Sequence, residues 1–217
     1  MALVFKNSLR PFVAPSLPNS PIQYTQGEFD KFNNVLRLYF NQIDRTVGAM
    51  IGGTGGGYLS FPYAAIQRTT DVTFTVNTPT QITFDQNDFL NGCTNDGTDG
   101  ILVDYYGIYN YQFSVQLKNV DTQIHSAWIW LRVNNVDVPG TSSKFDVISS
   151  HGGTPGYVIA ACNFYVSLEP GDTVEMWAAV SDVQVTFDAA PAQTSPFAMP
   201  AIPSVVATLT YVSTPPA

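Results

Sequence analysis

Charged side chains are scarce in this chain of 217 residues, where Asp, Glu, Lys and Arg together make up 12%. This is about half of the share that is usual in globular proteins. Lys and Arg number 9 against 17 Asp and Glu, so the formal net charge is −8, and no basic cluster occurs. Nucleic-acid binding needs basic side chains that neutralise phosphates, so we expect no nucleic-acid partner. A chain so poor in charge is expected to hide part of its surface in an oligomer.

Cysteine and long apolar runs are also rare. Two cysteines do not make a disulfide framework, so Cys93 and Cys162 are predicted to be free thiols. No apolar run reaches the length of a membrane span, so we expect no membrane partner. The first residues, MALVFKNSLRPF, resemble no secretion signal, because Lys6 and Arg10 interrupt a short apolar stretch. We therefore expect synthesis in a cytoplasm.

Residues suited to catalysis do not form a known motif. His125 and His151 are the only histidines, and neither belongs to a recognisable nucleophile motif. Ser149 and Ser150 precede His151, but adjacency in sequence does not give triad geometry. Paired carboxylates can hydrolyse glycans, yet most carboxylates here sit at turns, where Asp is common for local backbone reasons. The candidates are Asp85, Asp88, Asp96, Asp99, Asp104, Glu169, Asp172 and Glu175. We predict no enzymatic activity and no cofactor.

The stretch NDGTDG, residues 95–100, suggests a calcium loop. Hard cations take several oxygen ligands, and Asn95, Asp96 and Asp99 offer three. The EF-hand pattern fails, because its third position is Gly97 and its twelfth is Tyr106. We predict a plain loop and no metal site here. Whether an ion lies on the axis of an oligomer stays open.

Residues 1–57 are predicted to form a separate attachment region. Residues 1–22 are rich in proline and have no periodicity, which predicts an extended arm. A helix is predicted over about 26–47, ended by Gly48, and the stretch IGGTGGG then predicts a flexible linker. The apolar positions of the helix follow the 3, 4, 3, 4 spacing of an a/d seam. They are Phe29, Phe32, Leu36, Tyr39 and Ile43, and Val35, Phe40 and Val47 widen this stripe.

The apolar stripe must dock onto something, because so short a helix with exposed aromatics is unstable alone. Two alternatives stay open. The helix folds back onto its own domain, or it joins a bundle with sister chains or a socket on another protein.

Residues 58–217 show strand patterns only. Alternation is regular in 107–119, 126–135, 156–168, 172–181 and 203–213, and weaker in 71–77 and 80–85. In the first of these, Tyr109, Tyr111, Phe113, Val115 and Leu117 face one way. Period-two alternation demands a sheet with one buried face. About eight such strands predict a mainly β protein, an antiparallel jelly-roll β-sandwich.

Aromatic residues also occupy the faces opposite this predicted core. Trp128, Trp130, Tyr157, Ile159 and Tyr165 are the examples. An exposed apolar face of that size is costly in a monomer, so these residues predict packing between subunits. The alternative is that loops or the second sheet cover them.

The β region resembles the C1q/TNF-like jelly rolls. GIYNYQFSVQL, residues 107–117, is similar to their Gly-x-Tyr-x-Phe strand, and VSLEPGDTVEMWAAV, residues 166–180, to their penultimate turn and strand. AWIWLRVNN lies between the two at a fitting distance. The resemblance covers about residues 60–214 and implies a homotrimer with aromatic-lined strands around a threefold axis. Tyr109, Tyr111 and Phe113 match the central strand by pattern, and which of them reach the axis stays open.

A second resemblance concerns the helix. FNNVLRLYFNQID, residues 32–44, is similar to an N-terminal stretch on structural proteins of tailed phages, notably marine and cyanobacterial ones. The closing PAIPSVVATLTYV is similar to the last strand of such phage jelly rolls. This implies that residues 1–57 attach to the virion and that residues 58–217 project outward.

The sequence therefore predicts a phage virion protein, a trimeric decoration or cement protein on the capsid. Its expected partners are two sister chains and other virion proteins, such as the major capsid protein or tail and portal components. The alternative is a short tail or head fibre whose jelly roll binds a host surface glycan or protein. A cellular C1q-like adhesin is a different class, and it requires the secretion signal that this sequence does not show.

Overall fold

The computed structural model describes residues 15–17, 22–23, 25–51, 61–95, 97 and 100–213, with the side chains of 48–51 left out. The chain divides into two compact units, Met1–Ser60 and Phe61–Ala217. The predicted glycine linker and nearly all of the predicted arm lie outside the described residues. Among the residues described, no helix combines the length and the hydropathy of a membrane span.

The first unit contains helix α1, Gln26–Ile51. Glu28 lies in its first turn, where the helix dipole favours an acidic side chain, and accepts a 2.7 Å hydrogen bond from Lys31. The predicted end at Gly48 is wrong, because the helix continues to Ile51. One glycine inside a helix costs only about 1 kcal/mol relative to alanine, which does not stop a helix of this length.

The second unit is built from strands that are joined by turns and by a few longer loops. Their bounds are β1 Tyr63–Arg68, β2 Thr80–Ile82, β3 Gln86–Asn91, β4 Cys93–Asn95, β5 Ile101–Val103, β6 Gly107–Asn119, β7 His125–Val133, β8 Val136–Asp137, β9 Ser143–Val147, β10 Gly156–Leu168, β11 Thr173–Val180, β12 Val185–Phe187 and β13 Val205–Ser213. The long strands β6 and β10 have the same bounds as the alternating stretches that predicted them.

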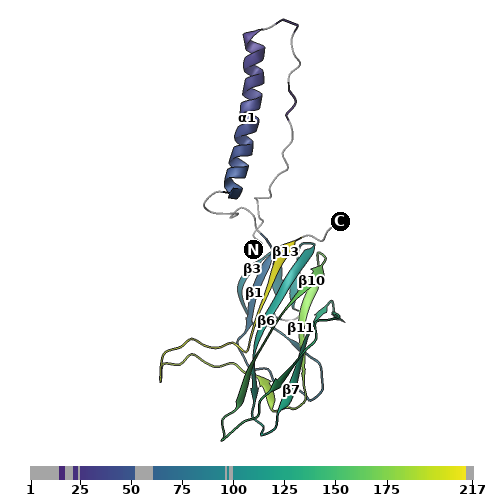
Figure 1. Ribbon diagram of the computed structural model, residues 1–217, viewed down its shortest axis with the longest axis vertical. Coiled ribbons are helices and arrows are strands. Elements are labelled where there is room, and N and C mark those ends of the chain that lie inside the picture. Colours follow the sequence, from purple (N-terminus) through teal and green to yellow (C-terminus); the bar gives the residue numbers. More distant parts are fainter. Residues whose placement is uncertain are drawn as a thin grey trace. The chain divides into compact units, whose positions relative to one another are not determined.

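The strands form two antiparallel sheets packed face to face (Figure 1). Sheet A has the order β10-β6-β13-β1-β3, and β12 also pairs with β6. Sheet B has the order β4-β5-β11-β7-β8, with β2 on β11 and β9 on β7. Sequence neighbours such as β6 and β7 lie in opposite sheets. The unit is therefore a jelly-roll β-sandwich, as predicted.

The core lies between the two sheets and takes every second residue of the long strands. On β6, Tyr109, Tyr111, Val115 and Leu117 are completely buried, and Phe113 nearly so. On β7, the inward residues are Ala127, Ile129, Leu131 and Val133, of which the first three are completely buried. Tyr109 and Tyr111 thus belong to the core of one chain, and a side chain with no exposed area cannot contact a second chain. The prediction that they pack around a trimer axis is wrong for both, and Phe113 also lies in this core.

The glycine of the Gly-x-Tyr-x-Phe stretch has a packing role. A Cβ atom on Gly107 would lie 2.3 Å from the ring of Tyr211, so no other residue fits there without moving it. The Tyr211 ring stands edge-on to Tyr109, with centroids 5.6 Å apart, and stacks on Phe61 at 5.9 Å. This motif therefore joins β6 to β13 at one end of the sandwich.

Residues 71–77 do not form the predicted strand. Val72 makes an isolated bridge with Phe187, through backbone hydrogen bonds of 2.9 and 3.0 Å. Phe74 is buried against Phe187, but the chain then turns at Asn77, whose φ is 54°. The apolar alternation here comes from a covering loop with two inward side chains and not from a paired strand.

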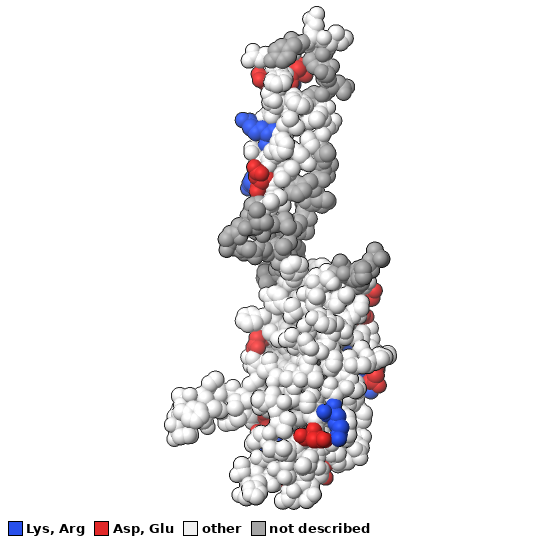
Figure 2. Space-filling model, viewed as in Figure 1, with Lys and Arg blue, Asp and Glu red and all other residues white. Residues whose placement is uncertain are grey.

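A hydrogen-bonded ribbon, which we call the finger, connects β12 to β13 over residues 189–203. Bridges join Ala190 to Ile202 and Gln193 to Met199. The finger projects from the side of the sandwich in Figure 1, and none of its residues belongs to the core cluster. From residue 189 to the last residue the chain has no charged side chain, and the finger is white in Figure 2.

Candidate interaction surfaces

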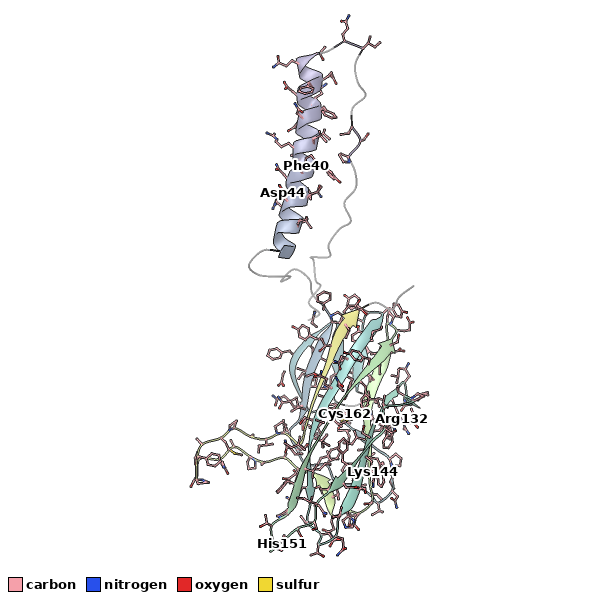
Figure 3. All side chains as sticks on the ribbon, in the orientation of Figure 1. Phe40, Asp44, Arg132, Lys144, His151 and Cys162 are labelled. Atoms are coloured by element: carbon pink, nitrogen blue, oxygen red, sulfur yellow. The ribbon has the colours of Figure 1, made fainter. Side chains whose placement is uncertain are left out.

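The histidines are not assembled into a catalytic site. His125 Nε2 lies 2.7 Å from Asp121 Oδ2, and this hydrogen bond is the main reason that the pKa of the Asp121 carboxyl is lowered. His151 is exposed in a hairpin, where its backbone pairs with Thr154. Figure 3 shows His151 at the end of the sandwich, well separated from Cys162 and Arg132. Among the residues described, no three His, Cys, Asp or Glu side chains group as metal ligands.

The turn carboxylates have local structural partners. Asp85 accepts from the backbone N–H of Thr69 at 2.8 Å, and Asp172 accepts from the N–H of Glu169 at 2.8 Å. Such side-chain to backbone bonds explain Asp at turns without any catalytic role. In the suggested calcium loop, the Asn95 side-chain oxygen accepts from the N–H of Gly97 at 3.1 Å. Asp96 and Asp99 lie outside the described residues.

Both cysteines are free, as predicted. Cys93 is buried in the core, and burial, with a smaller contribution from the charge of Asp104, raises its pKa to about 12. Cys162 is half-buried on β10, where its Sγ lies 3.4 Å from Ser143 Oγ. The Cys93 thiol is therefore not activated as a nucleophile at neutral pH.

Helix α1 offers the first apolar surface. Of the predicted attachment residues, Phe32, Leu36, Tyr39 and Ile43 are half-buried, and Phe29 is exposed. Leu38, Phe40 and Val47 are exposed as well. Figure 3 shows Phe40 and Asp44 on neighbouring turns of the helix. The helix therefore presents large apolar side chains around much of its circumference, more widely than one a/d seam.

The outer face of sheet A is the second surface. On β10, Tyr157, Ile159 and Tyr165 expose half or more of their area, at 50%, 63% and 65%. Phe89 on β3 and Val212 on β13 are also exposed. Amide and hydroxyl side chains fill the middle of the face, such as Gln112 opposite Asn163 and Thr208.

This face carries almost no charge. Among the outward positions of β1, β6, β10 and β13, Lys118 is the one charged residue, and on the edge strand β3 Asp88 accepts a hydrogen bond from the outward Gln67 side chain. Lys118 donates to Asp188 at 2.8 Å, and that hydrogen bond raises the pKa of Lys118. Depletion of charge together with exposed tyrosine is typical of the centre of a protein–protein interface. The finger arises from the same sheet, between β12 and β13, and exposes Phe197.

The outer face of sheet B is the third surface, and it holds all three tryptophans of the chain. Trp128 and Trp130 point outward from β7, and Trp177 pairs with Trp130 from the neighbouring β11. Trp130 Nε1 and Arg132 Nε donate to the same atom, Asp137 Oδ1, at 2.8 and 2.6 Å. The hydrogen bond from Arg132 is the largest cause that lowers the pKa of the Asp137 carboxyl, and the hydrogen bond from Trp130 is the next.

A second set of contacts fixes Trp177. Its indole N–H donates to Glu175 Oε2 at 2.7 Å, and the guanidinium of Arg132 lies 3.9 Å from the centre of its ring. Glu175 is almost completely buried and also accepts from the backbone N–H of Asn135 at 2.8 Å. Arg132 thus links the two tryptophans on this face through an ion pair and a cation–π contact.

A shallow hollow of about 440 Å³ lies beside Trp128 and Trp130. Its lining comes from β7, from Ala179 on β11 and from the loop between β8 and β9, and comprises Trp128, Trp130, Asp137, Val138, Pro139, Gly140, Ser142 and Ala179. Thr141 holds the loop in place, because its hydroxyl accepts from the N–H of Leu131 at 3.1 Å and donates to Val138 O at 2.8 Å.

The trimer-packing candidates are thus distributed over three places. Tyr109, Tyr111 and Phe113 lie in the core, Tyr165 lies on sheet A, and Trp128 and Trp130 lie on sheet B. The last three do face away from the core, but on opposite sides of the sandwich, so they do not form one patch. Sequence reasoning missed Trp177, Asp137 and Phe89. The alternation of 172–181 could have placed Trp177 outward, whereas the position of Asp137 beside Trp130 depends on a hairpin.

Comparisons with known proteins bear on the fold. Neither a protein-family model nor a curated protein matches this sequence. Among solved structures, the globular domain of zebrafish complement 1qA protein is similar at 13% identity and a TM-score of 0.44. The similarity covers 71% of this chain and 99% of that chain. It concerns shape and says nothing about activity, and the sandwich is established by its own strand pairing.

Proposed function

We propose that this protein is a homotrimeric, non-enzymatic structural protein of a tailed-phage virion, where it decorates the capsid. The unit Met1–Ser60 attaches it, and the β-sandwich is displayed. The observation that carries the proposal is the outer face of sheet A. That face is nearly uncharged yet exposes Tyr157, Ile159 and Tyr165.

Three copies would bury this face around an axis. Burying apolar area contributes roughly 25 cal/mol per Å², so a few exposed aromatics in each chain contribute several kcal/mol. The finger supports the same arrangement, because it is an uncharged ribbon and none of its residues belongs to the core cluster of its own chain. We assign Tyr165 and Ile159 to the contact in place of Tyr109 and Tyr111, which the core uses.

Attachment is assigned to helix α1. Its exposed Leu38, Phe40 and Val47, together with the half-buried stripe, offer apolar area to a capsid or portal protein. Three linked helices bind more tightly than one, because the second and third contacts form at a high effective concentration. The placement on a phage virion is supported by the resemblance of residues 32–44 to phage structural proteins.

Two measurements test this proposal. Light scattering on the purified full chain should give three times the mass of the 23.6-kDa chain. Immunogold labelling and quantitative mass spectrometry of purified virions should then find many copies on the head. A monomeric protein contradicts the trimer, and absence of the chain from purified virions contradicts the virion role. A Phe40→Lys variant that still forms trimers but no longer labels heads would assign attachment to the helix.

A second candidate function is a short fibre whose sandwich binds a host surface. The tryptophan-lined hollow on sheet B favours it, because a decoration protein needs no such feature. Labelling of host cells by the purified protein, with few copies per virion, would support the fibre.

A further inference from the structure

We infer that the outer face of sheet B carries a saccharide-binding site, the hollow lined by Trp128, Trp130 and the loop between β8 and β9. This inference goes beyond decoration of a capsid, and it names the ligand class of the second candidate function. It does not depend on the oligomeric state, because the hollow is formed by one chain.

The size of the hollow suits one or two sugar rings. Its volume of about 440 Å³ lies within the range of roughly 300–1,000 Å³ for small-ligand sites. Two indole rings form part of its lining, and Ala179, opposite Trp128 in the register, has no side chain beyond Cβ to fill the space. A pyranose presents an apolar C–H face and a rim of hydroxyls, which matches a ring surface bordered by polar groups.

The polar groups at the rim can bind hydroxyls. Both hydrogen bonds to Asp137 end on Oδ1, and its side chain is 66% exposed, so Oδ2 can accept from a ligand hydroxyl. Among the described residues, no protein atom accepts a hydrogen bond from the Trp128 indole N–H. Ser142 adds an exposed hydroxyl that can donate or accept.

The charge around the hollow favours a neutral ligand. Asp137 carries a carboxylate at the rim, and the chain has a net charge of −8. Lys144, which pairs with Trp128 in the register, is engaged by Asp146 at 2.9 Å. A phosphate or sulfate would meet the Asp137 carboxylate, and the residues that line the hollow include no Lys or Arg, so we assign neutral hexoses and N-acetylhexosamines.

The site is held in shape before any ligand arrives. Trp130 and Arg132 both donate hydrogen bonds to Asp137, and the Arg132 guanidinium makes a cation–π contact with Trp177. Thr141, itself buried, fastens the loop to β7. Such preorganisation lowers the entropy lost on binding. A face that served only as a flat protein contact would not need a fixed loop beside two indoles.

The test uses the full chain on an array of neutral and acidic bacterial surface glycans, followed by a tryptophan-fluorescence titration with the neutral oligosaccharide that binds best. Trp128→Ala and Trp130→Ala should each weaken binding about tenfold or more, as aromatic anchors at the centre of an interface do. Ser142→Tyr should have the same effect by filling the hollow from an exposed position, so the result does not depend on deleting a tryptophan. Tyr106→Ala, an exposed tyrosine in the loop between β5 and β6 and outside the surfaces assigned above, is the matched control and should bind normally.

Unchanged melting temperatures would show that each variant is folded. The inference is overturned if no glycan on the array binds, if only anionic glycans bind, or if Trp128→Ala and Ser142→Tyr leave the affinity unchanged. It is also overturned if Trp128→Ala lowers the mass of the oligomer, because the face is then a protein contact. Failure of the proposed virion role would appear separately, in the virion labelling.

Discussion

The outer faces of the two sheets are built from the same alternation but differ in chemistry. On sheet A, Tyr157, Ile159 and Tyr165 are at least half exposed, and no side chain in the described part of the chain hydrogen-bonds to either tyrosine. On sheet B, Trp130 and Trp177 are less exposed, and carboxylates fix both indole N–H groups. A broad apolar face suits contact with another protein, whereas fixed rings beside a hollow suit a small ligand. Outward aromatic residues in the same protein can therefore indicate two different kinds of binding surface.

The largest expected effect separates the two faces. Ile159→Lys on sheet A should convert the trimer to a monomer, because a charge would be buried at the contact between copies. Light scattering measures this as a fall to the mass of one chain. Val136→Lys is the matched control on sheet B, where the native side chain is 69% exposed, and it should leave the mass unchanged. Equal masses for both variants would remove the distinction between the faces.

A smaller effect on the same contact is expected from the finger. Replacing residues 191–201 by Asn-Gly would join Ala190 to Ile202 through a two-residue hairpin turn. The melting temperature should not change, because the finger contributes nothing to the core. Trimer association should weaken by up to about tenfold, or ~1.4 kcal/mol. Sedimentation over a dilution series checks this, and a lower melting temperature would instead assign the finger to its own chain.

The inward face of β6 gives a sharper test of which residues are core. The Tyr109 hydroxyl donates to Tyr105 O at 2.8 Å, whereas the buried Tyr111 hydroxyl has no partner among the described residues. Tyr109→Phe should therefore cost about 1 kcal/mol of unfolding free energy, while Tyr111→Phe should be neutral or stabilising. Chemical denaturation measures both. A loss of trimer mass in Tyr111→Phe would contradict its placement in the core.

The smallest expected effects are pH dependences of opposite sign on the two faces. The folded-state pKa of Asp137 lies below its ordinary 3.8, so its stabilising bonds are present above pH 3.8 and are lost as the pH falls through the lower value. Tryptophan fluorescence should report this on sheet B, and Asp137→Asn should abolish the transition.

On sheet A we expect a pH dependence of stability with the opposite sign. Lys118 has a folded-state pKa above its ordinary 10.5, so its contribution is present below pH 10.5 and is lost as the pH rises through the higher value. Alkaline titration of the wild type against Lys118→Met measures it. An alkaline transition that is the same in the wild type and in Lys118→Met would contradict the Lys118–Asp188 pair. An acid transition that persists in Asp137→Asn would contradict the assignment on sheet B.

Much of the fold was accessible to sequence reasoning where strands are long. The alternation of 107–119 and 156–168 predicted β6 and β10 with their observed bounds, because burial of one sheet face imposes a period of two. It failed for 71–77, where a loop covers the core with Val72 and Phe74. The prediction that Gly48 ends α1 was also wrong. A single glycine costs about 1 kcal/mol, which is small compared with the stabilisation from the rest of the helix.

The sequence by itself determined which residues of each long strand face the core. It also determined that Trp128, Trp130 and Tyr165 face away from the core. Only the tertiary structure decided that the first two and the third lie on opposite sheets, because sheet membership depends on pairing between strands distant in sequence. It also decided that Asp137, Arg132 and Trp177 meet Trp130, across a hairpin and a neighbouring strand. Alternation along one strand specifies whether each side chain faces the core or the solvent. A site is formed by residues of several strands, and folding decides which strands become neighbours.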